Sequence, residues 1–293
     1  MDKNGNQPRS MLMLAASMLI FGTIGIFRRY IPLSSGVLAF ARGLIGTVFL
    51  LVCRRLGSRG AGGPGTERRQ LPAGLLVFSG ALIGINWILL FEAYNYTTVA
   101  TATLCYYMQP IIVILLSPLV FRERLTLKKG ICTLAALAGM VLVSGAAGEG
   151  VPRGDALRGI LYGLGAAVLY ASVVILNKWI RNVDPWQKTI LQLASAAACL
   201  LPYLLVTGQF VRVEVSGFSI LMLLIVGIVH TGIAYALYFG STDGLRAQTI
   251  ALFSYIDPVS ALILSALVLR EPMTWTGLAG AVLVLGAALF SEL

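Results

Sequence analysis

Four ionisable side chains lie within long apolar stretches of the sequence: Arg42, Glu92, His230 and Asp257. A charge at the centre of such a stretch costs roughly 3 kcal/mol or more, so each group is expected to have a partner or a function. Asp257 directly precedes Pro258, and a proline inside a helix frees backbone groups for other partners. We therefore expect Asp257 to face a cavity. Its alternative role is half of a structural ion pair with Arg42.

The composition indicates whether these ionisable groups lie in water or in a membrane. Hydrophobic residues make up 58% of the chain and charged residues 12%, whereas soluble domains average about 45–50% and about 25%. The sequence therefore predicts an all-α polytopic membrane protein. The net charge of +10 comes from short basic clusters between apolar blocks, as is typical of residues beside a bilayer. We expect the lipid bilayer and no nucleic acid as a partner.

Glu92 and His230 each allow two interpretations. Glu92 is either a protonatable carboxylate of the cavity or a side chain that reaches the outer membrane surface near Asn95. His230 is the single histidine, so a histidine-based metal cluster is excluded, and we expect neither a metal nor a cofactor. It either bonds to a neighbouring helix or carries protons. Together with Arg42, these two residues are the candidates for proton coupling or gating.

Aromatic and amide side chains also fall within the apolar stretches rather than only at their ends. Tyrosine hydroxyls buried in hydrocarbon need hydrogen-bond partners. Such residues could form a pocket that stacks on an amphipathic solute, although ordinary helix packing explains any one of them equally well. The predicted substrate-binding residues are Asn86, Trp87, Tyr106, Tyr107, Gln109, Tyr170, Tyr235, Tyr255 and Asp257.

The elements that must position these residues are ten apolar segments, each near the roughly 20 residues that cross a bilayer as a helix. Five fall in each half of the chain, which divides it into residues 1–147 and 148–293. The predicted segments are 11–30, 34–53, 72–95, 98–121, 127–146, 156–180, 186–207, 217–240, 247–269 and 275–291.

The two halves are copies of one unit. YMQPIIVILLSPLVFRERLT at 107–126 aligns without a gap with YIDPVSALILSALVLREPMT at 255–274, at an offset of 148 residues and with nine of 20 positions identical. Shared Pro, Ser, Arg-Glu and Thr residues at one offset indicate duplication rather than chance. Because each copy has five crossings, the second must enter the membrane from the opposite side, as in many secondary transporters.

The distribution of lysine and arginine predicts the orientation. With the N-terminus inside, 15 of these residues lie in inner segments and six in outer segments. Positive residues are enriched on the cytoplasmic side, so both termini are expected in the cytoplasm and the protein in the cytoplasmic membrane. Glu123 and its copy Glu271 should then face opposite sides.

The sequence resembles the drug/metabolite transporter superfamily in its ten-helix EamA-type branch. The resemblance rests on AYNYTTVATATLCYYMQPIIVILLSPLVFRERLTLKKGICTLAALAGMVLVSG (93–145), on its weaker copy 241–291, and on AFARGLIGTVFLL (39–51). It implies a central cavity lined mainly by the first, third, fourth, sixth, eighth and ninth helices. It also implies that the fifth and tenth helices are peripheral, which allows a homodimer.

The expected function is that of a secondary transporter for a small organic metabolite, such as an amino acid, an amine or a similar amphipathic solute. We expect export by proton antiport, with Asp257 or Glu92 as the exchanging carboxylate. The alternatives are an uncoupled facilitated exchanger, an uptake transporter and, more distantly, an integral membrane enzyme. The sequence has no GxxxxGK[ST] phosphate loop that would favour an ATP-driven pump, and no group arrangement that points to a catalytic residue.

Overall fold

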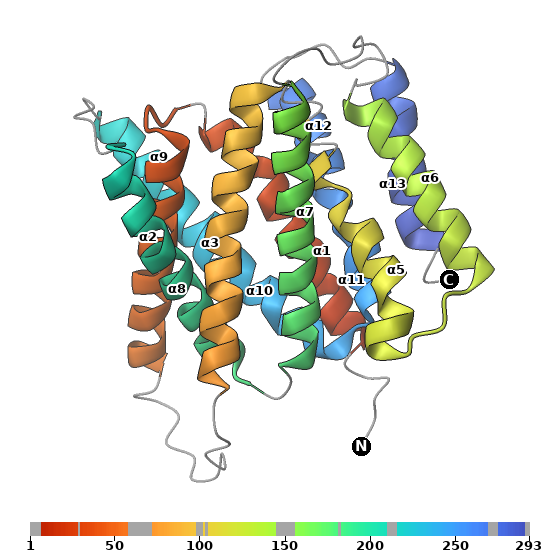
Figure 1. Cartoon of the computed structure of the whole chain (residues 1–293), viewed down its shortest axis with the longest axis horizontal. Helices are drawn as coiled ribbons and strands as arrows, with labels where there is room; N and C mark the ends of the chain where they lie inside the picture. The colour runs from red at the N-terminus through yellow and green to blue at the C-terminus, as the bar shows by residue number, and fades with distance from the viewer. Residues whose placement is uncertain are drawn as a thin grey trace.

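The chain folds into a bundle of helices in a computed structural model, which describes residues 7–28, 30–57, 72–97, 102, 105–144, 156–180, 183–209, 216–268 and 275–290 (Figure 1). No strand occurs within these ranges. The first half contributes α1 (Gln7–Arg28), α2 (Ser35–Gly57), α3 (Ala73–Tyr96), α5 (Gln109–Phe121) and α6 (Leu127–Ser144).

The second half repeats this series with more breaks. Its helices are α7 (Ala156–Trp179), α8 (Pro185–Val206), α9 (Gly217–Ile225), the π-helix η2 (Val226–Ile233), α10 (Ala234–Ser241), the 3-10 turn η3 (Thr242–Gly244), α11 (Ala247–Phe253), α12 (Ile256–Val268) and α13 (Trp275–Phe290).

These helices confirm the ten predicted segments. Within the described residues, five helices are long and apolar enough to cross a membrane: Ser35–Leu56, Ala73–Ala93, Leu157–Trp179, Pro185–Val206 and Gly217–Ser241. The last of these runs through α9, η2 and α10 as one crossing. The other five predicted segments contain α1, α5, α6, α11 with α12, and α13, of which α5 and α13 include shorter apolar helices.

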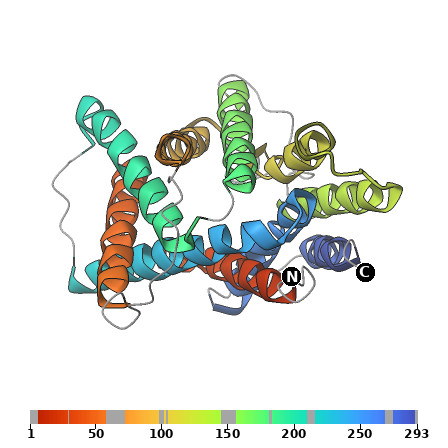
Figure 2. The same cartoon turned by 90° about the horizontal axis from the view of Figure 1, so that it is seen from below.

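The helices are arranged around a centre, with one pair set apart. The most extensive contacts join α3 to α7 and α8, α2 to α8 and η2, and α1 to α10 and α12. By contrast, α6 and α13 pack chiefly on each other, and they lie at one edge of the bundle when it is seen from below (Figure 2). The fifth and tenth helices are therefore peripheral, whereas a homodimer through them stays a prediction.

Corresponding helices of the two halves run in opposite directions. In Figure 1, α5 runs toward the lower end of the bundle and α12 toward the upper end, while α6 runs upward and α13 downward. This is the inverted relationship expected from five crossings per copy. Glu271, which was expected to face the side opposite to Glu123, lies outside the described residues.

The fourth and ninth crossings are both interrupted just before their prolines. In the ninth, α11 ends at Phe253, a turn follows at Ser254 and Tyr255, and α12 carries Pro258 in its first turn. In the fourth, residues 107–108 form the turn and α5 carries Pro110 at its start. Proline lacks a backbone N–H, a loss that is tolerated in the first turn of a helix. The repeated proline therefore sets the same break in both halves.

Close packing of α3 on α8 depends on glycine. A Cβ atom at Gly84 would lie 2.8 Å from the carbonyl oxygen of Ala196, and one at Gly80 would collide with the carbonyl oxygen of Gln192. Small residues four positions apart let two helix backbones approach closely in membranes. This contact brings α3 against the centre of the bundle.

We predict that Gly84→Ala lowers the free energy of unfolding by roughly 1–3 kcal/mol, because the added methyl forces α8 away. The check is thermal unfolding of the purified protein. Gly74→Ala is the matched control, because nothing lies within 4 Å of a Cβ atom there. Equal melting temperatures for the two variants would contradict the close contact.

Candidate functional site

A cavity of about 570 Å³ lies at the centre of the bundle. It is lined by α1, α2, α3, α7, η2, α10 and both interrupted crossings, so the second crossing joins the set that the family resemblance implied. The lining residues are Met18, Phe21, Gly22, Ile24, Ser35, Leu38, Arg42, Trp87, Leu90, Phe91, Tyr106, Tyr107, Gln109, Tyr170, Val226, Tyr235, Ser254, Asp257 and Ala261.

Arg42 supplies the positive charge of this cavity. Its guanidinium carbon lies 4.8 Å from the centre of the Trp87 ring, and its Nε donates to Thr231 Oγ1 at 3.1 Å. A guanidinium over an indole face is attracted by the ring's quadrupole. Among the described residues, the partners that hold Arg42 against α3 and η2 are therefore all neutral.

The π-helix η2 explains how Thr231 reaches Arg42. Thr231 Oγ1 donates to the carbonyl oxygen of Val226, five residues earlier, at 3.0 Å, so its lone pairs are left to accept from Arg42. π-helical turns are often found at functional sites. Nothing in the local sequence VGIVHTGI distinguishes this turn from ordinary α-helix.

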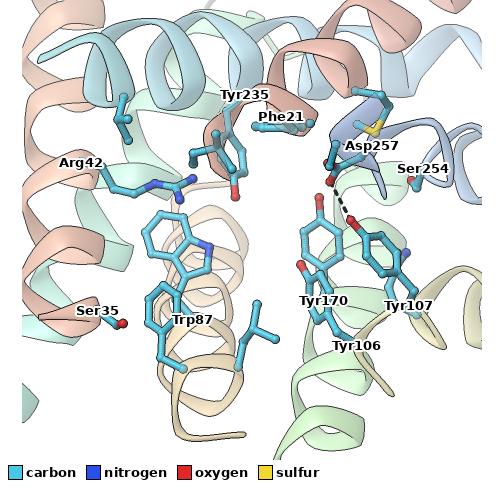
Figure 3. A pocket seen from close by; sticks show the side chains of 18 of the residues that line it. Phe21, Ser35, Arg42, Trp87, Tyr106, Tyr107, Tyr170, Tyr235, Ser254 and Asp257 are labelled. Carbon is cyan, nitrogen blue, oxygen red and sulfur yellow. Dashed lines mark hydrogen bonds between the residues drawn. The ribbon is translucent and has the colours of Figure 1, made fainter. Parts of the chain in front are cut away.

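Asp257 supplies the negative charge, on the opposite side of the cavity. Its Oδ2 accepts from the hydroxyl of Tyr107 at 3.0 Å. It also lies in the first turn of α12, where the helix dipole favours an anion. Figure 3 shows Arg42 and Trp87 on one side and Asp257 with Tyr107 on the other.

The alternative role of Asp257, an ion pair with Arg42, is therefore wrong. Each has a different hydrogen-bond partner, and aromatic side chains lie between them (Figure 3). The sequence placed both charges at similar depth, but it could not show that α1 and α10 bring Phe21 and Tyr235 between them. Phe21 and Tyr235 meet edge to face with their ring centres 5.0 Å apart.

Aromatic residues make up seven of the other 17 lining residues. Tyr106 stacks on Tyr170 with ring centres 5.8 Å apart, and Trp87 meets Tyr235 at 6.2 Å. Aromatic pairs of this kind hold their geometry through their quadrupoles. An apolar solute body placed here would meet ring faces and edges together with aliphatic side chains such as Met18 and Leu38.

Six predicted substrate-binding residues in addition to Asp257 line the cavity: Trp87, Tyr106, Tyr107, Gln109, Tyr170 and Tyr235. Their role in binding stays a prediction. Asn86 and Tyr255 lie outside the lining. Asn86 is buried and its Nδ2 donates to the carbonyl oxygen of Ala166 at 2.6 Å, and the Tyr255 hydroxyl donates to the carbonyl oxygen of Tyr107 at 3.2 Å. Both serve helix packing at these positions.

His230 also lies away from the cavity lining. His230 Nε2 shares a hydrogen bond with the Thr23 hydroxyl at 2.6 Å, and its Nδ1 lies 3.5 Å from the carbonyl oxygen of Ile225; the tautomer of the ring sets the direction of the first bond. The imidazole ring meets Phe27 edge to face at 4.9 Å. His230 is buried and joins η2 to α1 in this position. A role in proton coupling or gating stays a prediction.

Glu92 lies in a second, smaller cavity. Its Oε1 accepts from the Tyr203 hydroxyl at 2.8 Å and its Oε2 from Asn95 Nδ2 at 3.3 Å. That cavity adjoins the central one, because Ser35 and Phe91 line both. The side chain thus lies beside Asn95 and next to the central cavity, and its role in proton coupling or gating stays a prediction.

Sequence analysis missed several lining residues. Ser254 was recoverable, because the 148-residue offset pairs it with Tyr106. Ser35 and the apolar residues Leu38, Leu90 and Ala261 carried no signal, because similar residues line every packed surface of the bundle.

The cavity extends toward the end of the bundle where α2 begins, whereas hydrogen bonds join the helices at the other end. It extends to Ser35, the first residue of α2. At the opposite end, Glu123 accepts from the backbone N–H groups of Ala247 at 3.1 Å and Gln248 at 3.5 Å, which fixes the end of α5 to the start of α11. Carboxylates are favoured at helix N-termini.

Two buried lysines close the same end. Lys188 Nζ donates to the carbonyl oxygens of Asn177 at 3.1 Å and Ile180 at 3.3 Å, and to Thr242 Oγ1 at 3.1 Å. Lys178 Nζ donates to the carbonyl oxygen of Thr242 at 3.1 Å. These contacts join the end of α7 to α8 and η3, so movement at this end must break several charge-assisted hydrogen bonds.

Comparison with known proteins gives the family context. The model of the EamA-like transporter family matches residues 8–145 and 157–292. A relative named "Uncharacterized transporter YxxF" from Bacillus subtilis is 30% identical over 255 residues, which cover 87% of this chain and 80% of the relative. A "Probable amino-acid metabolite efflux pump" from Salmonella typhimurium is 28% identical over 232 residues, which cover 74% and 76%.

One solved structure, titled "Crystal structure of protein", superimposes with a TM-score of 0.81 at 22% identity. The match covers 97% of this chain and 98% of the other. At this identity the likeness shows the fold alone.

If the cavity is hydrated, Ser254→Cys should react with a small water-soluble thiol reagent in a variant whose four native cysteines are alanine. A thiol reacts as its thiolate, which forms in water but not in a packed apolar interior. Ala251→Cys is the matched control, because this buried position precedes Ser254 by about one helical turn. We expect at least about tenfold faster labelling at 254, measured by mass spectrometry, and equal rates would contradict an accessible cavity.

Proposed function

Because the chain belongs to the EamA-like transporter family, we propose that it moves a small amphipathic solute bearing an ammonium group, such as an amino acid or amine, by alternating access. The chain is a membrane transporter and not an enzyme. The observation that carries the choice of solute is the pair of opposite charges on two walls of one aromatic cavity, Arg42 and Asp257.

The two charges would divide the recognition of a zwitterion. A solute carboxylate suits Arg42, whose planar guanidinium can present two parallel N–H donors to one carboxylate. A solute ammonium suits Asp257, and the rings of Trp87, Tyr170 and Tyr235 suit an apolar body between them. A volume of about 570 Å³ falls within the range of about 300–1,000 Å³ usual for small-molecule sites. The name of the Salmonella relative supports amino-acid metabolites as the first class to test.

We propose export by proton antiport, with Asp257 as the exchanging carboxylate. The sequence has no phosphate-binding loop, so an ion gradient is the available energy source for uphill transport. Burial disfavours the charged form of a carboxylate, so a proton and a solute ammonium compete for it. The alternatives are an uncoupled facilitated exchanger and an uptake transporter.

Alternating access requires the closed end to open. The contacts of Glu123 with α11 and of Lys188 with α7 and η3 would then separate, while the end at Ser35 closes. Inverted repeats allow two such states of similar energy around one central site.

The proposed setting is the cytoplasmic membrane with both termini inside, so that the open end at Ser35 faces outward. In a cysteine-free background, Thr207→Cys should be labelled by a membrane-impermeant maleimide in intact cells. Arg124→Cys should be labelled only after the cells are permeabilised. Both positions are exposed. Labelling of both from the same side would contradict opposite placement of these two ends.

Proton coupling predicts that a pH gradient drives solute movement in proteoliposomes and that Asp257→Asn abolishes this response. A gradient of one pH unit supplies about 1.4 kcal/mol per proton, enough for about tenfold accumulation. The measurement is uptake of radiolabelled L-phenylalanine with and without the gradient.

Asp184→Asn is the matched control for that experiment. Asp184 is an exposed N-cap of α8, and asparagine caps a helix as well as aspartate does. If flux in the parent ignores the gradient, the uncoupled exchanger is correct. If Glu92→Gln rather than Asp257→Asn removes the response, Glu92 is the exchanging carboxylate.

The divided recognition of a zwitterion predicts a selective effect of Arg42→Gln. We expect it to weaken binding of L-phenylalanine by about tenfold or more, because a charge-assisted hydrogen bond to the solute carboxylate is lost. Binding of 2-phenylethylamine, which has no carboxylate, should change much less. Isothermal titration of the purified protein measures both, and equal losses for the two ligands would contradict the assignment.

A further inference from the structure

A second cavity of about 210 Å³ lies beside the central one, at the end of the bundle where α2 begins and α3 and α8 end. Its walls are mainly polar, in contrast to the aromatic walls of the central cavity. The lining residues are Ser34, Ser35, Gly36, Ile88, Phe91, Glu92, Asn95, Tyr203 and Gln209. Ser35 and Phe91 also line the central cavity, so the smaller cavity lies at its mouth.

Glu92 is held in this cavity by neutral donors. The Tyr203 hydroxyl donates to Oε1 at 2.8 Å and Asn95 Nδ2 donates to Oε2 at 3.3 Å. Gln209 completes the chain, because its Nε2 donates to the Tyr203 oxygen at 3.4 Å and its Oε1 accepts from Ser34 at 3.2 Å. The carboxylate is therefore fixed in position by helices α3 and α8 together.

Among the described residues that line this cavity, none carries a positive charge to match Glu92. None of the nine lining residues is lysine, arginine or histidine. A carboxylate fixed by neutral donors in a partly enclosed, polar space favours a cation, and an ammonium group can donate up to three hydrogen bonds to it and to nearby oxygens. The hydroxyls of Ser34 and Ser35 and the amide oxygens of Asn95 and Gln209 provide such acceptors.

The acidic side chain at the position of Glu92 is present in only one half of the repeat. The 148-residue offset pairs Glu92 with Gly240. A Cβ atom at Gly240 would lie 3.0 Å from the terminal methyl of Met13 and 3.4 Å from Pro185, so this position is packed and a larger side chain would have to displace these neighbours. The duplicated fold therefore does not require an acidic group here, and only one end of the pathway has it.

We propose that the Glu92 cavity is a second binding site, separate from the central one, which takes the ammonium group of a cationic or zwitterionic solute at the mouth of the pathway. The solute class rests on the proposed function, whereas the site rests on the geometry around Glu92. A solute ammonium bound here lies beside Ser35 and Phe91, the residues that lead to the central cavity.

The test is equilibrium binding of radiolabelled 2-phenylethylamine, an ammonium ion at neutral pH, to the purified full-length protein. We expect two equivalents bound by the parent, one by Glu92→Gln, one by Asp257→Asn and none by the double variant. Affinity at the lost site should fall by about tenfold or more. Unchanged stoichiometry and affinity in Glu92→Gln would overturn the second site.

A second variant at the rim keeps Glu92 intact. Asn95 is exposed, so Asn95→Arg should fold, and its guanidinium should pair with Glu92 and displace the amine from this site. Thr207→Arg is the matched control, because it adds the same charge at an exposed position on the same end of the bundle. Loss of one equivalent in Asn95→Arg but not in Thr207→Arg supports the site, and equal behaviour of the two overturns it.

The outcomes separate this inference from the proposed function. The parent protein could bind a single equivalent of 2-phenylethylamine that is lost in Glu92→Gln and kept in Asp257→Asn. This result upholds the second site and rejects Asp257 as the central ammonium partner. If the single equivalent is instead kept in Glu92→Gln and lost in Asp257→Asn, the second site is rejected and the proposed function is left intact. Absence of binding in the parent overturns both.

Discussion

The constraint on which this structure depends is the cost of a charge inside an apolar bundle. Arg42 and Asp257 could have neutralised each other, but the fold keeps them on opposite walls of one cavity. Each is instead held by neutral groups: Arg42 by Thr231 and the Trp87 ring, and Asp257 by Tyr107. Buried charges that lack an opposite charge are expensive, so a ligand that brings both charges offsets this cost.

Several irregular features of the fold serve this arrangement. The π-helical turn directs Thr231 to Arg42, and the interruption at Ser254–Tyr255 places Asp257 at the start of a new helix. The same interruption occurs before Pro110, but there the equivalent residue is Gln109. Duplication thus placed the same helix interruption in both halves, whereas a difference at one position, Asp257 against Gln109, gives a negative charge to the second half only. The same holds for Glu92, whose counterpart is Gly240.

The sequence predicted the architecture well, because each part of it has a strong local signal. Twenty-residue apolar segments, a repeated proline and an offset of 148 residues define ten crossings, two broken helices and an inverted repeat. Five of the seven aromatic residues of the cavity wall, among them Trp87 and Tyr170, were also predicted, because they lie within apolar segments rather than only at their ends. The pairing of charges was not predictable, since it depends on which side chains of α1 and α10 lie between two other helices. The π-turn and the partners of Glu92 likewise arise from tertiary packing and leave no mark in one sequence.

The central claim is that the cavity binds its solute across the two charges. The most direct measurement is an experimental structure of the protein in lipid nanodiscs with saturating L-phenylalanine. We expect ligand density in the cavity of about 570 Å³, with the carboxylate at Arg42 and the ammonium at Asp257. Density at another place, or a ligand that contacts neither charge, would contradict it.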